Sequence, residues 1–265
     1  MRNLEVNGHV PDLAQTQRLA NLNYGHFTSM QVRDRAVRGL ALHFARLADG
    51  NEEFFGWAMG VEDEHRLRSL ILHALGDTAD ASVQVRFVPA GAAAGLAVEP
   101  DVVVSVSEPA PAEPRPPLQV TVDHYRRDWP DHKHAATMGL TYAIRRARLA
   151  GYDDALFVGD DDLVREGTVW NVAFLDGDQI VWPQAPMLKG VTMVLLQVAL
   201  TMQGTPWTTR PVDVATLGSF DGAAATNSIC PAQPIAAIGD HRFPASDKLT
   251  GLLADAWRSV PFDAL

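Results

Sequence analysis

Five prolines lie within the ten residues 108–117, in the middle of a chain of 265 residues. Proline has no backbone N–H and a fixed φ, so this segment can form neither a helix nor a central strand. It is best explained as a semi-stiff extended connector, although a proline-rich surface loop within one domain would have the same composition. The sequence therefore predicts an N-terminal domain at residues 1–108 and a C-terminal domain at residues 118–265, joined by a linker at residues 109–117.

Composition excludes several classes of protein. The formal net charge is −10 with a pI near 5.3. A protein that binds nucleic acid needs a cluster of positive charge, and the sequence shows none. The single cysteine, Cys230, allows neither an intrachain disulfide nor a cysteine metal site, and we expect it to be a small buried residue. The N-terminus has no apolar run typical of a signal peptide, and no apolar stretch is long enough to span a membrane. A soluble, cytoplasmic protein is expected.

Apolar periodicity and turn residues predict a mixture of helices and strands. In the N-terminal half we expect strands at 4–8, 27–32, 35–38, 82–88 and 102–106, and helices at 40–48 and 62–75. In the C-terminal half we expect strands at 118–122, 154–159, 163–166, 168–175, 179–182 and 231–238, and helices at 134–150, 190–202 and 245–257. Because no regular βαβ alternation is visible, both halves are interpreted as α+β.

Lys133 is the most informative candidate for chemistry. It follows a turn that contains Pro130 and lies at the predicted start of a helix, where partial desolvation would lower its pKa and make the amine nucleophilic. Taken alone, it would more simply be a surface lysine. No metal is expected, because His132 and His134 do not share a helix face and the acidic run 159–162 is interpreted as an exposed turn.

Other sequence blocks give Lys133 a context. They are Gly25–Val32 with His43–Leu47, Gly151–Phe157, Val164–Thr168 with Asn171–Phe174, Lys189–Thr192 and Thr226–Pro234. In this order and at these spacings the chain resembles the class IV, or fold-type IV, enzymes that depend on pyridoxal 5′-phosphate (PLP). That family includes branched-chain aminotransferases, D-amino acid transaminases and aminodeoxychorismate lyases. The resemblance covers residues 24–47 and 125–240.

The resemblance implies roles for individual residues. Lys133 would carry PLP as a Schiff base and then shuttle a proton, and Glu166 would keep the pyridine nitrogen protonated. Arg46 would clamp the phosphate together with the first turn of the helix that begins at Gly190. The remaining cofactor contacts implied are Asn171, Val191, Thr192, Asn227 and Ser228.

The implied activity is transfer of an amino group between a small amino acid or amine and a keto acid. A lyase that releases pyruvate is the alternative, because the stretches around Thr28 and Asn227 are similar to the lyase branch, in which Thr28 or Ser29 would assist. A non-catalytic relative is a second alternative, against which the retained Lys133 and Glu166 argue. The predicted substrate pocket comprises Tyr24, Thr28, Ser29, Arg127 and Trp129, with Arg126 or Arg127 for a carboxylate.

Three positions depart from the family pattern. Thr137 stands where many members have a tyrosine, Met193 replaces an arginine, and Lys189 replaces a proline. The fold implied is that of a D-amino acid aminotransferase-like enzyme of class α+β / α/β. It would have a smaller N-terminal α+β domain, a larger barrel-like C-terminal domain and PLP in the cleft between them. Family members are usually homodimers, so a homodimer is expected.

Overall fold

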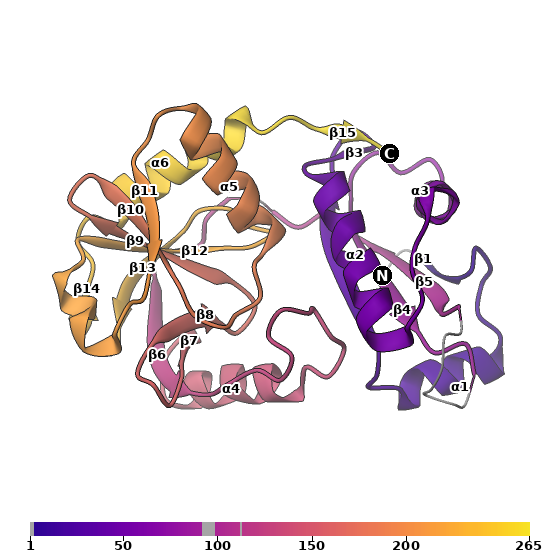
Figure 1. Ribbon diagram of the computed structural model, residues 1–265, viewed down its shortest axis with the longest axis horizontal. Coiled ribbons are helices and arrows are strands. Elements are labelled where there is room, and N and C mark those ends of the chain that lie inside the picture. Colours follow the sequence, from indigo (N-terminus) through magenta and orange to yellow (C-terminus); the bar gives the residue numbers. More distant parts are fainter. Residues whose placement is uncertain (1–2, 92–98, 112) are drawn as a thin grey trace. The chain divides into compact units, whose positions relative to one another are not determined.

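A computed structural model of the chain describes residues 3–91, 99–111 and 113–265. Residues 1–2 and 92–98 of the predicted N-terminal domain, and Ala112 of the predicted linker, lie outside the described residues. The chain divides into two compact units (Figure 1). The first unit comprises Met1–Ala110, His132–Ala136 and Phe262–Leu265, and the second comprises Pro111–Asp131 and Thr137–Pro261. The segment that contains Lys133 thus belongs to the first unit, while the predicted domain limits stay a prediction.

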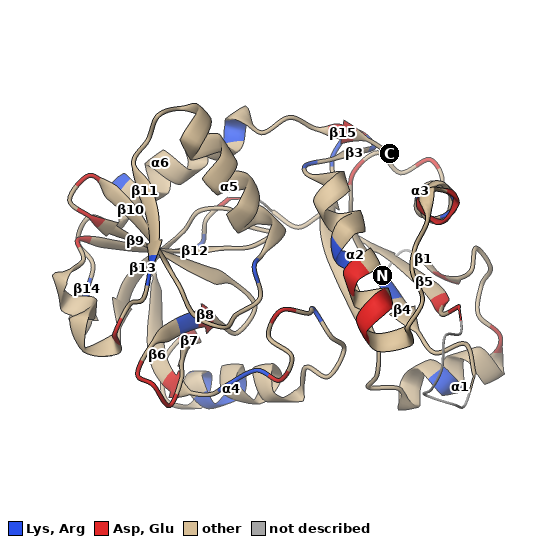
Figure 2. Cartoon of the chain, in the orientation of Figure 1, with Lys and Arg blue, Asp and Glu red and all other residues tan. Residues whose placement is uncertain are grey.

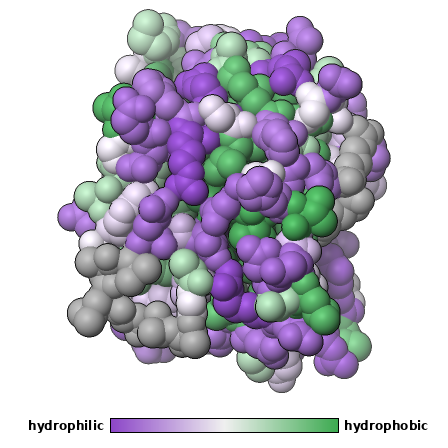
Figure 3. Space-filling view, turned by 90° about the vertical axis from the view of Figure 1, so that its right-hand side faces the viewer, coloured by the Kyte–Doolittle hydropathy of each residue, from purple (hydrophilic) through white to green (hydrophobic). Residues whose placement is uncertain are grey.

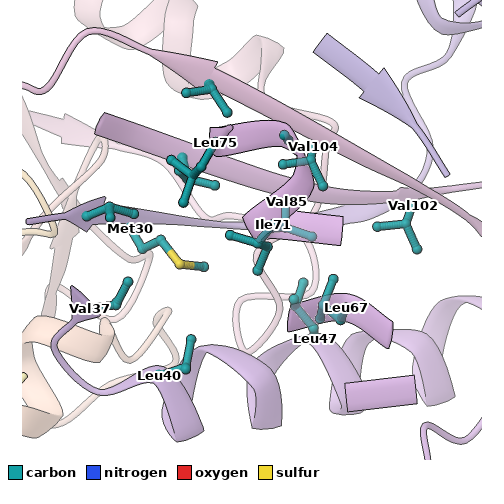
Figure 4. Close-up of a cluster of buried hydrophobic side chains, with 14 of the residues drawn as sticks. Met30, Val37, Leu40, Leu47, Leu67, Ile71, Leu75, Val85, Val102 and Val104 are labelled. Carbon is teal, nitrogen blue, oxygen red and sulfur yellow. The ribbon is translucent and has the colours of Figure 1, made fainter. Parts of the chain in front are cut away.

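The first unit is built on a four-stranded antiparallel sheet in the order β1-β5-β4-β2. Its strands are β1 (Asn3–Val6), β2 (His26–Val32), β4 (Ala81–Val88) and β5 (Asp101–Ser107). Buried and half-buried residues alternate along β2 and most of β4, so one face of the sheet lies on a core. Helices α2 (Leu40–Phe55) and α3 (Val61–Leu75) supply the other side of that core, as Figure 4 shows.

Three short elements complete the first unit. Helix α1 (Leu13–Asn21) begins with a capping box formed by Asp12 and Gln15, and β3 (Ala36–Val37) pairs with the C-terminal strand β15 (Asp263–Ala264). The sequence did not predict α1 or β15. Helix α1 is polar on average and buries no residue completely, and both residues of β15 are exposed, so neither carries the buried apolar residues from which elements are inferred.

The second unit contains a curled, nine-stranded sheet in the order β11-β10-β9-β12-β13-β6-β7-β8, with β14 paired to β13. Its strands are β6 (Leu118–His124), β7 (Asp154–Val158), β8 (Val164–Gly167), β9 (Asn171–Asp176), β10 (Gln179–Pro183), β11 (Trp207–Arg210), β12 (Gly222–Thr226), β13 (Gln233–Ile238) and β14 (His241–Arg242). The helices are α4 (Met138–Leu149), α5 (Val191–Met202) and α6 (Ser246–Ser259), with a 3-10 turn, η1 (Val214–Ser219). Helices α5 and α6 pack on one face of the sheet at β9, β10 and β12, and the opposite face encloses a second core. Strand β7 is buried throughout because α4 covers its other face.

Two expectations for the second half of the chain are wrong. The helix predicted at 134–150 begins only at Met138, because His134 forms a β-bridge with His26; Lys133 is therefore not at a helix terminus. The pairs β6–β7 and β10–β11 are parallel and are connected through α4 and α5, so βαβ units are present. The predicted hairpins β7–β8 and β9–β10 are confirmed.

The surface carries both signs of charge, spread over helices and loops (Figure 2). On the face drawn in Figure 3, hydrophobic residues are dispersed among hydrophilic ones. Among the described residues, no helix is both long enough and apolar enough to cross a membrane.

Candidate active site

Lys133 is fixed to the edge strand of the first unit. The Phe27 N–H donates to the Lys133 carbonyl (2.9 Å), and the Ala135 N–H donates to the Gly25 carbonyl (2.7 Å). The Lys133 ammonium lies 4.9 Å from the centre of the Phe27 ring, within reach of a cation–π attraction. A rigid strand therefore sets the position of this amine, although the local sequence predicted a helix.

A second cation, Arg46, lies in the same neighbourhood. The pKa of His43, one turn earlier on α2, is lowered to about 3, mainly by burial and further by the charges of Arg46 and Lys133. His43 is therefore neutral, and its Nδ1 lies 2.6 Å from the Thr28 hydroxyl. Two cations around a neutral histidine form an environment that favours an anionic ligand.

The predicted pocket residues of the first unit do not all lie together. Thr28 is completely buried on the α2 side of β2, where its hydroxyl is bonded to His43. Ser29 is half-buried on the opposite face, which it shares with Phe27 because side chains two residues apart on a strand point the same way. The hydroxyl of Tyr24 donates to the Phe54 carbonyl (2.7 Å). The structure thus places Ser29, but not Thr28, on the face that carries Phe27.

In the second unit, Glu166 and Arg127 are both buried, and the charge of Glu166 acts on Arg127. Each residue is only 5 % exposed, and the charge of Glu166 raises the pKa of Arg127 against a larger lowering by burial. The Leu188 N–H donates to Glu166 Oε1 (3.3 Å). Buried charges are costly unless they are paired or hydrogen-bonded, so Arg127 and the Leu188 N–H reduce the cost of burying this carboxyl group. Trp129, two residues after Arg127, is 62 % exposed.

The side chain of Asn171 is hydrogen-bonded to residues 188 and 190, in the segment that precedes α5. Its Nδ2 donates to the Leu188 carbonyl (2.7 Å), and its Oδ1 accepts from the Gly190 N–H (2.9 Å). A Cβ at position 190 would lie 2.4 Å from that Oδ1, so glycine permits the approach. The first-turn N–H groups that follow have no partner within the helix, and Thr192 is buried beside them. The start of α5 therefore has the donors that an anion such as phosphate requires.

The predicted contacts Asn227 and Ser228 lie in a turn beside Asn171. Thr226 pairs with Asn171 in the register of β12 and β9, and the turn follows directly. Asn227 Oδ1 accepts from the N–H groups of Ile229 and Cys230, each at 2.9 Å. The structure thus brings Asn171, the start of α5 and this turn to one edge of the sheet. Leu188 links Glu166 to these groups, because its N–H donates to Glu166 and its carbonyl accepts from Asn171.

The sequence did not single out two residues that border these groups. In the first unit, the Arg86 guanidinium lies 5.8 Å from the centre of the same Phe27 ring that Lys133 approaches. In the second unit, the Tyr125 phenol is within electrostatic reach of Glu166 and Arg127. Neither belongs to a motif, and an arginine on the polar face of a strand or a tyrosine at a strand end is common.

Comparison with known proteins gave a match to one family model. A family model described as amino-transferase class IV matches residues 25–238. Comparison with curated protein sequences gave no significant match.

Solved structures share the fold. A hypothetical aminotransferase from Mycobacterium tuberculosis in its PLP-bound form has a TM-score of 0.79 at 19% identity, covering 96% of this chain and 98% of that chain. The branched-chain amino acid aminotransferase of Escherichia coli has a TM-score of 0.83 at 13% identity, covering 98% of this chain and 94% of that chain. A putative 4-amino-4-deoxychorismate lyase from Legionella pneumophila has a TM-score of 0.75 at 18% identity, covering 88% and 91%. The expected fold class, α+β / α/β of fold type IV, is confirmed.

Proposed function

Because the chain belongs to the class IV aminotransferase family, we propose that it uses PLP to transfer an amino group between a small amino acid or amine and a keto acid. The observation that carries the proposal is the fixed position of Lys133, which two backbone hydrogen bonds hold against β2 beside Phe27. A surface lysine in a mobile loop would have no such support.

Lys133 and Glu166 take the two chemical roles. Bound PLP supplies an electron sink for the substrate's Cα. The amine of Lys133 would hold the cofactor covalently and would move a proton at the substrate's Cα. The side chain of Glu166, which is buried and acts electrostatically on Arg127, would hold a proton on the ring nitrogen of the cofactor. The proposal requires both residues to act on the same cofactor.

We assign the phosphate of the cofactor to Arg46 and to the hydrogen-bond donors at the start of α5. Arg46 supplies positive charge from α2, and the N–H groups of Val191 and Thr192 supply donors at the start of α5. The hydroxyls of Thr192 and Ser228 are further donors. Asn171 and Asn227 act by holding these segments in place, which the hydrogen bonds of their side chains support.

The proposal also includes the predicted substrate pocket. Ser29 is favoured because it shares a strand face with Phe27, while Tyr24, Thr28, Arg127 and Trp129 stay predictions. We also expect a homodimer in the cytoplasm, and light scattering of the purified protein tests the dimer.

A lyase that releases pyruvate is the second candidate. The observation in its favour is Ser29, whose hydroxyl is on the Phe27 face of β2 and which could assist at the reacting atoms. The similarity in fold to a putative lyase is compatible with this reaction but does not decide for it.

Substrate assays distinguish the candidates. The PLP-loaded protein is incubated with D- or L-amino acids plus 2-oxoglutarate or pyruvate, and separately with aminodeoxychorismate. Amino transfer without release of an aromatic amine is the expected result, and Lys133→Ala abolishes it while the surface variant Lys248→Ala does not. Release of pyruvate and an aromatic amine without amino transfer would replace the proposal by the lyase.

A further inference from the structure

We propose that Thr28 and His43 are positioning residues, whose hydrogen bond fixes strand β2 against helix α2. This bond sets the distance between the amine of Lys133 and the guanidinium of Arg46, and so between the groups that hold the two ends of the cofactor. The inference rests on the proposed function, which assigns the aldehyde end of the cofactor to Lys133 and the phosphate end to Arg46. All four residues belong to the first unit.

The hydrogen bond joins the two elements next to the groups that it positions. Thr28 Oγ1 and His43 Nδ1 are 2.6 Å apart, and both residues are buried. Thr28 directly follows Phe27, whose N–H donates to the Lys133 carbonyl (2.9 Å) and whose ring centre lies 4.9 Å from the Lys133 ammonium. At the other end of the bond, Arg46 lies one turn after His43 on α2. A shift at this bond would therefore move both cations.

The neighbouring contacts between β2 and α2 are apolar. The buried side chains of β2 pack in one cluster with those of α2, and this cluster includes Met30, Val32, Leu40, Phe44 and Leu47. Apolar contacts are not directional, so they do not by themselves fix how far a strand lies along a helix. A hydrogen bond holds its two atoms within a narrow range of distance and angle. The polar pair is thus suited to fixing the register of the two elements.

A second buried hydrogen bond supports the first. His26 Nε2 and Asn51 Oδ1 are 2.9 Å apart, and they also join β2 to α2. The two bonds flank Phe27 on the strand and Arg46 on the helix, so a shift of either segment would strain both bonds. The bond to His43 is the nearer one to Arg46 along the helix, and we expect it to have the larger effect on the phosphate end.

His43 can make this bond without adding a positive charge. Its pKa is lowered to about 3, mainly by burial and further by the charges of Arg46 and Lys133. A neutral imidazole has one donor and one acceptor nitrogen, so either tautomer can bond to a hydroxyl. His43 therefore fixes the two elements without repelling either cation.

The test compares the affinities of wild type and variants for PLP and for pyridoxal, which lacks the phosphate. Each Kd is measured by absorbance titration of the apoprotein. Thr28→Val keeps the shape of the side chain but removes the hydroxyl. It should lower the preference for PLP over pyridoxal roughly tenfold, the loss expected for one hydrogen bond to the phosphate. Thr28→Ser retains the hydroxyl and should retain the preference.

A double-mutant cycle tests the pairing itself. His43→Leu removes the same bond from its other end and should lower the preference by a similar factor. The double variant Thr28→Val/His43→Leu should lose no more than either single variant, because both substitutions remove one bond. If the two single losses multiply in the double variant, the residues do not act as a pair and the inference is overturned.

Stability is controlled separately. Urea denaturation checks that each variant is folded, and if Thr28→Val is not, His43→Leu provides the comparison with wild type. Asn3→Ala removes the hydrogen bond from Asn3 to the Ala74 carbonyl (3.0 Å), in the same unit but outside β2 and α2. It should lower stability and leave the preference for PLP unchanged. An equal loss of preference in Asn3→Ala would mean that general loosening of the unit, and not the pair, is responsible.

Failure of this inference differs from failure of the proposed function. If wild type prefers PLP and Thr28→Val retains that preference, or loses affinity for both compounds by the same factor, only the role of the pair is overturned. If wild type binds both compounds equally well, the assignment of Arg46 to the phosphate is overturned together with the role of the pair. If wild type binds neither compound and borohydride fixes neither on Lys133, the proposed function itself is overturned.

Discussion

Asp154 illustrates how a single buried residue stabilises the approach to the site. Its carboxylate, 7 % exposed, accepts from the Thr168 hydroxyl (2.6 Å), the Trp170 indole N–H (3.0 Å) and the Ala155 N–H (2.8 Å). Thr168 and Trp170 follow Glu166 in the connection from β8 to β9. One carboxylate therefore fixes the chain between Glu166 and Asn171.

Replacing this carboxylate should lower stability markedly. Asp154→Ala leaves buried donors without an acceptor, and we expect the free energy of unfolding to fall by about 3 kcal/mol. Urea denaturation measures the change. Asp160→Ala, in an exposed turn, is the matched control and should change stability by less than about 0.5 kcal/mol. Equal effects of the two substitutions would contradict the role of Asp154.

The buried histidines of the first unit should make stability depend on pH. Burial lowers the pKa of His26 to about 4 and that of His43 to about 3, from 6.5. Above pH 6.5 both are neutral whether the chain is folded or not. Below it the unfolded chain binds protons that the folded chain does not, so stability falls as the pH is lowered towards 4.

A substitution isolates the histidine contribution. His26→Phe removes one of these protons, so the fall in stability between pH 6 and pH 5 should become smaller by about 1.4 kcal/mol per pH unit. Urea denaturation at several pH values gives the slope. The slope is the readout because the lost bond to Asn51 (2.9 Å) lowers stability at every pH. An unchanged slope would mean that His26 is protonated in the folded chain.

At the scale of elements, the start of α5 shows why the site needs a glycine. Position 190 has ordinary extended backbone, φ −64° and ψ 141°, so its conformation does not require glycine. The requirement comes from Asn171, whose Oδ1 occupies the space of a side chain at position 190. The helix start is therefore fixed by a strand residue nineteen positions earlier.

Gly190→Ala should weaken cofactor binding. The added Cβ breaks the bond between Asn171 and the Gly190 N–H, and we expect the Kd for PLP to rise roughly tenfold, the equivalent of one lost hydrogen bond. Fluorescence or absorbance titration of the apoprotein with PLP measures it. Gly251→Ala, in α6 with nothing within 4 Å of the new Cβ, is the matched control and should leave the Kd unchanged. A wild-type Kd for Gly190→Ala would remove the start of α5 from the proposed site.

At the scale of the whole molecule, the first unit is assembled from three stretches of chain. The C-terminal stretch pairs β15 with β3 and places the Asp263 carboxylate at the start of α2, where it accepts from the Leu40 N–H (3.0 Å). Gly39, the N-cap residue of α2, has no side chain that could do this. The helix that carries His43 and Arg46 is thus capped from the far end of the sequence.

Removing this cap should destabilise the first unit. Asp263→Ala should lower the free energy of unfolding by about 1 kcal/mol, as loss of an N-cap usually does. Thermal or urea unfolding measures it. Asp255→Ala, which removes a surface ion pair within α6, is the control and should have a smaller effect. A larger loss for Asp255→Ala would contradict the capping role.

The sequence predicted most of the strands and helices whose apolar residues repeat at regular spacing, such as β4, α3 and the β9–β10 hairpin. It failed where tertiary contacts override local preference. Residues 134–137 were expected to be helical, but the pairing of His134 with His26 keeps this stretch out of the helix, which begins at Met138. Asp263 was also missed, because its role depends on Leu40, which is distant in the sequence.

The site residues were chosen by motif order, which identifies residue types at fixed spacings but not the faces on which they lie. Thr28 and Ser29 fitted the same motif equally well, and only the strand geometry separates them. Asn171 was expected near the ring, yet its hydrogen bonds are to the segment before α5.

The central claim, that Lys133 carries the cofactor, is tested most directly by fixing PLP with borohydride and mapping the labelled peptide. The only lysines in the chain are Lys133, Lys189 and Lys248, so the result is unambiguous. We predict a yellow protein that is labelled at Lys133, with the label retained in the double variant Lys189→Arg/Lys248→Arg and lost in Lys133→Arg. A colourless protein that PLP does not reconstitute, or a label confined to Lys189 or Lys248, would contradict the account.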